Sequence, residues 1–227
     1  MTAADERPLE GKIHYPSYVN LDPFIDLARL RSLDSYLRER IEKRIARTND
    51  TAFYTGPFLL EDHLDRIPGS RMIYLSRSRR DDDYYDLDVP DLWERSPEAE
   101  EFSELMDFIG TLPFQATGRM LIMYDERGRS VPAHRDHDSV ELCHEFVWFR
   151  TNLEKPFYML NPQSGEQRYV ASHCAWFDTV NQYHGADETA ALSYSIRIDG
   201  RFSDEFRSLI PFPERHRSAA ASCWACS

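Results

Sequence analysis

Residues 118–202 constrain the fold more than any other part of the chain. Helical spacing of apolar residues is absent there, and short extended runs are separated by turn residues. Such a pattern is typical of antiparallel sandwiches and double Greek-key jelly rolls. We therefore expect a mainly β fold with flanking helices, built on a double-stranded β-helix (jelly roll, cupin-like). The expected strands are 119–125, 132–138, 144–152, 157–161, 166–171, 174–180 and 191–199.

Two stretches before this region have helical patterns. Asp22 and Pro23 provide an N-cap and a first-turn proline, and apolar residues at helical spacing continue to Ile45, with a break expected near 32–34. A second helix is expected to start at Ser96 and to end at Gly110. We interpret the first helix as a buttress for the β core. The region 203–209 is expected to form a closing helix.

We expect a single domain over residues 1–227. In this division residues 1–117 are helical and extended support with a possible lid, residues 118–202 are the jelly-roll core, and residues 203–227 are a helix and tail. The polar, aromatic segment 76–90 is either a solvated loop or a substrate-facing lid with Tyr84 or Tyr85 turned inward.

The charge balance excludes several classes of partner. The chain has 39 acidic and 27 basic residues, for a net charge of −12. Nucleic-acid binders need a basic footprint, so we expect no nucleic-acid partner. No apolar run approaches the roughly 20 residues that span a bilayer, and the N-terminal residues lack a signal-peptide pattern. We expect no membrane partner and a cytoplasmic location.

Four cysteines give no sign of a disulfide framework. Cys143 and Cys174 lie in apolar, strand-like surroundings and are expected to be buried free thiols. Cys223 and Cys226 have redox-motif spacing, but they lie at the end of the chain without a βαβ context, so we interpret them as part of a frayed tail.

A metal site is predicted from two segments that lie far apart in the sequence. His134 and Asp136 are two residues apart in an expected strand, so their side chains share one face. His184 follows after several further strands, which allows it to return alongside them. Two imidazoles and a carboxylate leave open coordination positions and suit iron(II). His137 or Asp138 could replace Asp136, although strand geometry disfavours His137.

Arg197 is expected to point into the barrel. Along 191–199, apolar residues alternate with Ser193, Ser195, Arg197 and Asp199. A buried guanidinium needs an anionic partner. Either a ligand carboxylate, with the Ser195 hydroxyl, meets it, or it forms an ion pair with Asp199 or another acid, or it lies at the open end of the barrel.

Three further residues are candidates for contact with a bound ligand. They are Tyr124, His144 and Arg150. For each of them a structural role in the core or at a strand end is the alternative.

The order His134-x-Asp136, His184, Arg197 resembles the iron(II)/2-oxoglutarate-dependent dioxygenases. The layout over about residues 105–202 is similar to their aspartyl/asparaginyl β-hydroxylase-like branch, which includes proline hydroxylases. The resemblance implies iron(II) on His134, Asp136 and His184, and 2-oxoglutarate held at its far carboxylate by Arg197 and Ser195. It also implies O2 as oxidant, succinate as product, and hydroxylation of an amino acid or peptidyl side chain.

Two other functional classes remain open on the sequence. A zinc or other metal-dependent hydrolase could use the same three ligands with a metal-bound water, although it needs no inward arginine to anchor a dicarboxylate. A non-catalytic jelly-roll binding protein with a vestigial triad is the third reading.

Overall fold

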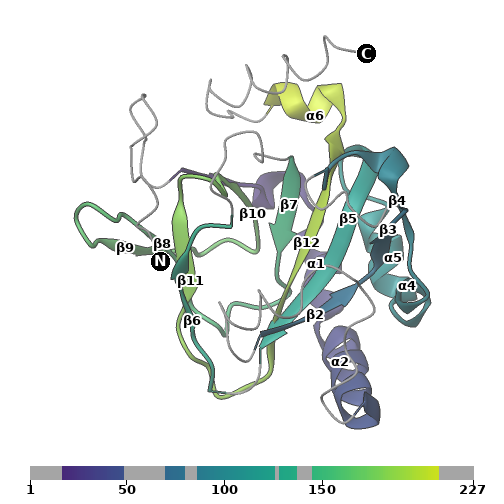
Figure 1. Ribbon diagram of the computed structural model, residues 1–227, viewed down its shortest axis with the longest axis horizontal. Coiled ribbons are helices and arrows are strands. Elements are labelled where there is room, and N and C mark those ends of the chain that lie inside the picture. The colour runs from purple at the N-terminus through teal and green to yellow at the C-terminus, as the bar shows by residue number, and fades with distance from the viewer. Residues whose placement is uncertain (1–16, 49–69, 80–85, 126–127, 137–144, 210–227) are drawn as a thin grey trace.

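Two antiparallel sheets face each other in the computed structural model, which describes residues 17–48, 70–79, 86–125, 128–136 and 145–209 (Figure 1). The larger sheet has the order β1-β10-β7-β12-β5-β2, and the smaller has the order β6-β11-β8-β9. Their bounds are β1 Tyr18–Asn20, β2 Ser70–Tyr74, β5 Phe114–Asp125, β6 Val131–His134, β7 Phe146–Phe149, β8 Phe157–Leu160, β9 Gln167–Tyr169, β10 Cys174–Phe177, β11 Tyr183–Ala186 and β12 Ser193–Phe202.

The connectivity from β5 to β12 identifies the fold. Strands β5, β7, β10 and β12 belong to the larger sheet, and β6, β8, β9 and β11 belong to the smaller one, so the chain crosses repeatedly between the two. This winding is that of a double-stranded β-helix. The jelly-roll prediction is confirmed. Strands β1 and β2 extend the larger sheet at its two edges.

The larger sheet has one face toward the helices and one toward the smaller sheet. Tyr194 of β12 donates a hydrogen bond from its hydroxyl to the backbone carbonyl of Asp34 at 3.0 Å, so its face of the strand is the helix-facing one. Leu30, Leu37 and Ile41 are fully buried and belong to the same apolar core as the sheet residues. The opposite face of β12 carries Arg197, which points between the sheets.

The helices are shorter than the sequence predicts. The first region divides into a 3-10 turn at Asp22–Phe24, α1 at Leu27–Ser32 and α2 at Asp34–Thr48, with the expected break at Leu33. The second divides into α4 at Glu98–Glu101 and α5 at Ser103–Ile109, because the chain leaves helical geometry at Phe102, whose side chain is fully buried. Helix α6 at Asp204–Leu209 agrees with the expected closing helix.

Several strand expectations need correction. The second strand of the core, β6, ends at His134 and does not continue to residue 138 as predicted, and β11 was not predicted as a strand. Part of the segment 76–90 is also regular, because β3 at Ser76–Ser78 pairs with β4 at Trp93–Arg95. A further 3-10 turn lies at Pro90–Leu92.

Some predicted features lie outside the described residues. These are Tyr84, Tyr85, Cys143, Cys223 and Cys226. Cys174 is a buried free thiol, as predicted, and burial raises its pKa. None of the helices in the described ranges has both the length and the apolar content that crossing a bilayer requires.

Leu37 offers a test of the packing between α2 and the sheet. Leu37→Ala should reduce the free energy of unfolding by about 2–5 kcal/mol, because it removes buried methyl groups and leaves a cavity. Leu153→Ala is the matched control, since Leu153 is 42% exposed, and it should change stability by roughly 0.5 kcal/mol or less. Denaturant titration of both variants measures the difference. Equal effects would contradict this packing.

Candidate metal centre

His134 and His184 are brought together by the pairing of β6 with β11. The two residues lie directly opposite each other in the antiparallel ladder, and their ring centroids are 4.5 Å apart. Cross-strand neighbours of this kind have β-carbons about 5 Å apart. The ladder register therefore places two imidazoles side by side, although the residues are far apart in the sequence.

Asp136 completes the cluster from just beyond the end of β6. Its carboxylate Oδ1 lies 3.5 Å from His134 Nε2 and 3.2 Å from His184 Nε2. Each residue offers one ligand atom, and these atoms all lie within 4.8 Å of one another. The sequence analysis assumed that strand alternation positions Asp136. This is wrong, because β6 ends at His134. The backbone N–H of Asp136 instead donates to the Thr179 carbonyl at 3.1 Å.

A rigid turn over residues 178–182 delivers His184 to the site. The Asp178 carboxylate accepts hydrogen bonds from the backbone N–H groups of Val180 and Asn181, both at 3.1 Å. The Gln182 side chain donates to the Leu160 carbonyl and accepts from the Ser17 N–H. Side chains thus replace ladder bonds where the chain enters β11.

Gly185 allows β11 to lie close to its neighbours. A β-carbon at this position would lie 2.5 Å from the Tyr158 hydroxyl oxygen and 2.8 Å from the Val131 carbonyl oxygen. Both distances are shorter than real contacts, and one of the two obstacles is backbone. Glycine after His184 is therefore required by space in this ladder.

The hydrogen bonds of the imidazoles favour metal binding. Nδ1 of His134 is 2.9 Å from the Pro132 carbonyl, and Nδ1 of His184 is 3.2 Å from the Gln182 carbonyl. A carbonyl only accepts, so each Nδ1 carries a proton, and the Nε2 atom of each ring faces Asp136. Such backbone contacts are the usual way to fix the tautomer of a metal ligand. Three converging lone-pair atoms need a cation or an additional proton between them.

The surroundings of the three groups differ from one side to the other. His184 is 5% exposed and packs against the rings of Phe177 and Phe157, at centroid distances of 4.7 and 5.7 Å. The side chains of His134 and Asp136 are 29% and 22% exposed. The cluster therefore has an apolar wall behind His184 and an accessible side next to His134 and Asp136.

Asp136 remains ionised in this environment. Burial alone raises the pKa of its carboxyl, but the His184 ring, the contacts with both imidazoles and the Arg197 guanidinium together hold that pKa well below its usual range. An ionised carboxylate is the form that a metal ion binds.

Arg197 is buried beside the triad and pairs with two carboxylates. Its Nη1 is 2.8 Å from Asp136 Oδ2, and its Nε donates to Asp199 Oδ1 at 2.9 Å. The guanidinium also lies 4.0 Å from the centroid of the Phe146 ring. The ion pair with Asp199 weighed in the sequence analysis is therefore present, and Asp136 is a second partner. Ser195 is half-buried on the same face of β12.

The other candidates for cosubstrate contact are not brought to this cluster. Tyr124 lies opposite Tyr194, so it is on the helix-facing side of the sheet. Arg150 is 5% exposed, and its guanidinium donates to the carbonyls of Lys155, Val170 and Ser172. Burial lowers the pKa of Arg150 to about 10. We leave both out of the site, and His144 lies outside the described residues.

Sequence reasoning missed Arg119, an inward-facing residue of β5 that pairs with Asp199. Trp148 lies opposite Arg197 in the ladder, and Asp199 is opposite Phe146. Arg119 donates from Nε to Asp199 Oδ2 at 2.9 Å. The alternation of Arg119 with Leu121 and Met123 along β5 was the available signal, but alternation does not reveal which strand lies alongside.

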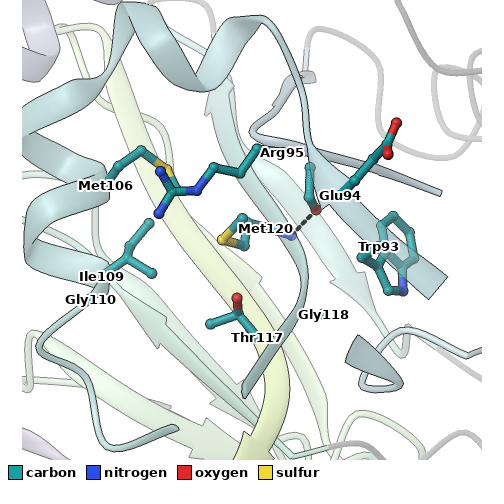
Figure 2. A pocket seen from close by; sticks show the side chains of 10 residues that line it. Trp93, Glu94, Arg95, Met106, Ile109, Gly110, Thr117, Gly118 and Met120 are labelled. Atoms are coloured by element: carbon teal, nitrogen blue, oxygen red, sulfur yellow. Dashed lines mark hydrogen bonds between the residues drawn. The ribbon is translucent and has the colours of Figure 1, made fainter. Parts of the chain in front are cut away.

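A separate cavity lies on the other side of β5 (Figure 2). Its volume is about 170 Å³. Figure 2 shows the Arg95 side chain directed toward that of Met106. Met120 lies opposite Ile198 of the helix-facing core. The sheet therefore separates this cavity from the triad.

Comparisons with known proteins found similarity to solved structures only. No family model matches the chain, and no curated protein matches it. A prolyl hydroxylase from Trichoplax adhaerens, solved with a hypoxia inducible factor peptide fragment, is 10% identical, with a TM-score of 0.49 over 86% of this chain and 87% of that chain. A Pseudomonas putida prolyl-4-hydroxylase is 11% identical, with a TM-score of 0.45 over 82% and 93%.

A third structure is a viral collagen prolyl hydroxylase from Paramecium Bursaria Chlorella virus-1, in its 2OG complex. It is 9% identical, with a TM-score of 0.41 over 83% of this chain and 97% of that chain. All three are prolyl hydroxylases by their descriptions. Identities this low do not carry residue roles from those proteins to this chain.

A divalent metal ion should bind only when all three residues of the triad are present. We expect cobalt(II) added to metal-free protein to raise the melting temperature and to produce a visible absorption band, because two imidazoles and a carboxylate become its ligands. Asp136→Ala and His184→Ala should lose both effects. His173→Gln is the control, since His173 is buried outside the triad. Cobalt binding by Asp136→Ala as tight as in the parent protein would contradict this site.

Metal affinity should fall between pH 7.5 and pH 5.5. Imidazole nitrogens must be free of protons to bind a metal, so protons compete at His134 and His184. Asp136 does not contribute to this change, because its pKa is held well below its usual range. Cobalt titrations at both pH values measure the effect. An affinity that is equal at the two values would contradict histidine ligation.

Proposed function

We propose that this protein is a non-haem iron(II)- and 2-oxoglutarate-dependent oxygenase that hydroxylates an amino acid or a peptidyl side chain. One observation carries the proposal: the convergence of two imidazole Nε2 atoms and one carboxylate oxygen from His134, His184 and Asp136. Two neutral nitrogens and one anionic oxygen suit iron(II) and leave positions open for other ligands.

His134, Asp136 and His184 would hold the ion. When bound, iron(II) supplies the site for oxygen activation, with electrons from oxidative decarboxylation of 2-oxoglutarate. In the overall reaction, substrate C–H, 2-oxoglutarate and O2 give substrate C–OH, succinate and CO2. Asp136 as a protein ligand favours hydroxylation over halogenation, because a halogenase of the resembled family leaves that position to halide.

The surrounding residues support the division of the site into two sides. Phe177 and Phe157 exclude water behind His184. Pro132 and Ala133, on β6 next to His134, are exposed and border the accessible side. We assign that side to the substrate. The net charge of −12 favours a basic or zwitterionic substrate by simple field arguments.

We keep the prediction that Arg197 and Ser195 contact the far carboxylate of 2-oxoglutarate. Both lie on the inward face of β12, with Arg197 beside the triad. Arg197 is also committed to Asp136 and Asp199, so the contribution of Ser195 becomes the more informative one to measure.

A metal-dependent hydrolase is the second candidate, and the pairing of Arg197 favours it more than the sequence did. An inward arginine argued for a dicarboxylate ligand, yet protein carboxylates meet this guanidinium at 2.8 and 2.9 Å. The inward position of Arg197 therefore does not distinguish an oxygenase from a hydrolase. Cosubstrate binding does.

Anaerobic addition of iron(II) and then 2-oxoglutarate should separate the candidates. We expect the weak visible charge-transfer band of an iron–2-oxo acid chelate, and on admission of O2 slow formation of succinate even without substrate. His134→Ala should lose the band. Ser195→Ala should need several-fold more 2-oxoglutarate to reach the same intensity, because a hydroxyl donor is lost.

The alternative has its own outcome in the same samples. No band and no succinate with the parent protein, together with zinc-dependent ester or amide hydrolysis, would establish the hydrolase in place of the oxygenase. Unchanged 2-oxoglutarate dependence in Ser195→Ala would remove Ser195 from the site without affecting the triad.

A further inference from the structure

We propose that Arg119, Asp199 and Arg197 form a positioning chain that holds the metal ligand Asp136 in one orientation. This inference rests on the proposed metal centre. It assigns Arg197 a duty at the metal ligand that exists before any cosubstrate binds, and it gives Arg119 and Asp199 roles in a site that they do not touch directly.

The four charged groups form one continuous series. Arg119 Nε donates to Asp199 Oδ2 at 2.9 Å, Asp199 Oδ1 accepts from Arg197 Nε at 2.9 Å, and Arg197 Nη1 lies 2.8 Å from Asp136 Oδ2. All three distances are those of charge-assisted hydrogen bonds. The series runs from β5 across β12 to the loop after β6, so it links the larger sheet to the metal ligand.

Burial makes each member of the series depend on the next. Asp199 is 0% exposed, Arg197 is 4% exposed and Arg119 is 8% exposed. A buried charge without a partner costs several kcal/mol. Two guanidinium groups and two carboxylates alternate here, and their formal charges cancel. Removal of one charge therefore leaves the neighbouring charge without its partner. That neighbour can find another partner only by moving.

The pairing also decides which oxygen of Asp136 faces the histidines. Oδ2 is engaged by Arg197, while Oδ1 lies 3.2 and 3.5 Å from the two Nε2 atoms. Rotation of the carboxylate would break the contact with the guanidinium. Asp136 is thereby prepared to bind through one oxygen, which leaves a coordination position for another ligand.

The environment of Arg197 fits a positioning residue. Its Nη2 is inaccessible to solvent and lies 2.8 Å from Asp199 Oδ1, although no hydrogen bond forms between these two atoms. The Phe146 ring covers the guanidinium at 4.0 Å. A bidentate grip on an external carboxylate needs two accessible N–H groups, so Nη2 would have to be uncovered first.

The affinity for a metal ion in the absence of 2-oxoglutarate tests the positioning chain directly. Asp199→Asn should weaken cobalt(II) binding about 10–100-fold, although residue 199 is not a ligand, because an NH2 group replaces one of the two oxygens that accept from Arg119 and Arg197. Arg197→Lys should weaken it as well, since one ammonium cannot bridge both carboxylates in the same geometry. Arg44→Gln is the matched control: Arg44 is 6% exposed and pairs with Glu98 and Glu101, outside the site. It should lose stability but keep its metal affinity.

The outcomes separate this inference from the proposed function. Unchanged cobalt affinity in folded Asp199→Asn and Arg197→Lys would overturn the positioning chain. A raised 2-oxoglutarate requirement with unchanged cobalt affinity would show Arg197 to be a cosubstrate anchor instead. Failure of the parent protein to bind any metal would contradict the proposed function itself. If Asp199→Asn does not fold, Arg119→Gln at the end of the series should give a smaller loss of affinity in the same direction.

Discussion

The register between β6 and β11 is the constraint on which the rest of the site depends. It sets His134 directly opposite His184 and so brings these two distant parts of the chain together. Gly185 permits the register because a side chain there would strike the Val131 backbone. The turn that the Asp178 side chain stabilises leads the chain into β11 in this register. A slip of one residue would turn one imidazole to the opposite face of the sheet.

The electrostatics follow from that geometry. Two imidazole Nε2 atoms face Asp136, and the His184 ring, the contacts with both imidazoles and the Arg197 guanidinium together keep this carboxylate ionised against the effect of burial. Burial of Arg197 is tolerable because Asp199 and Arg119 continue the alternation of charge. The site thus combines three electron-rich ligand atoms with a protein interior that holds them in place. Such an arrangement is stable with a cation at its centre.

Much of the fold could be predicted because local patterns determine it. Alternation along β12 correctly separated Tyr194, which meets α2, from Arg197, which meets Asp136. The short length of β11 and its glycine concealed that strand. The sequence pattern selected three residues that do lie together, but for Asp136 the reason was wrong: the loop bond to Thr179 and the ion pair with Arg197 position it, not strand alternation. Partners across strands, such as Arg119 with Asp199, depend on sheet order, which local patterns do not contain.

Anomalous diffraction from crystals grown with manganese(II) measures the central claim most directly. The account predicts a single strong peak about 2.0–2.2 Å from His134 Nε2, His184 Nε2 and one oxygen of Asp136. It further predicts that Arg197 remains on the other oxygen of that carboxylate. A peak elsewhere, or none between these three side chains at saturating manganese, would contradict the account.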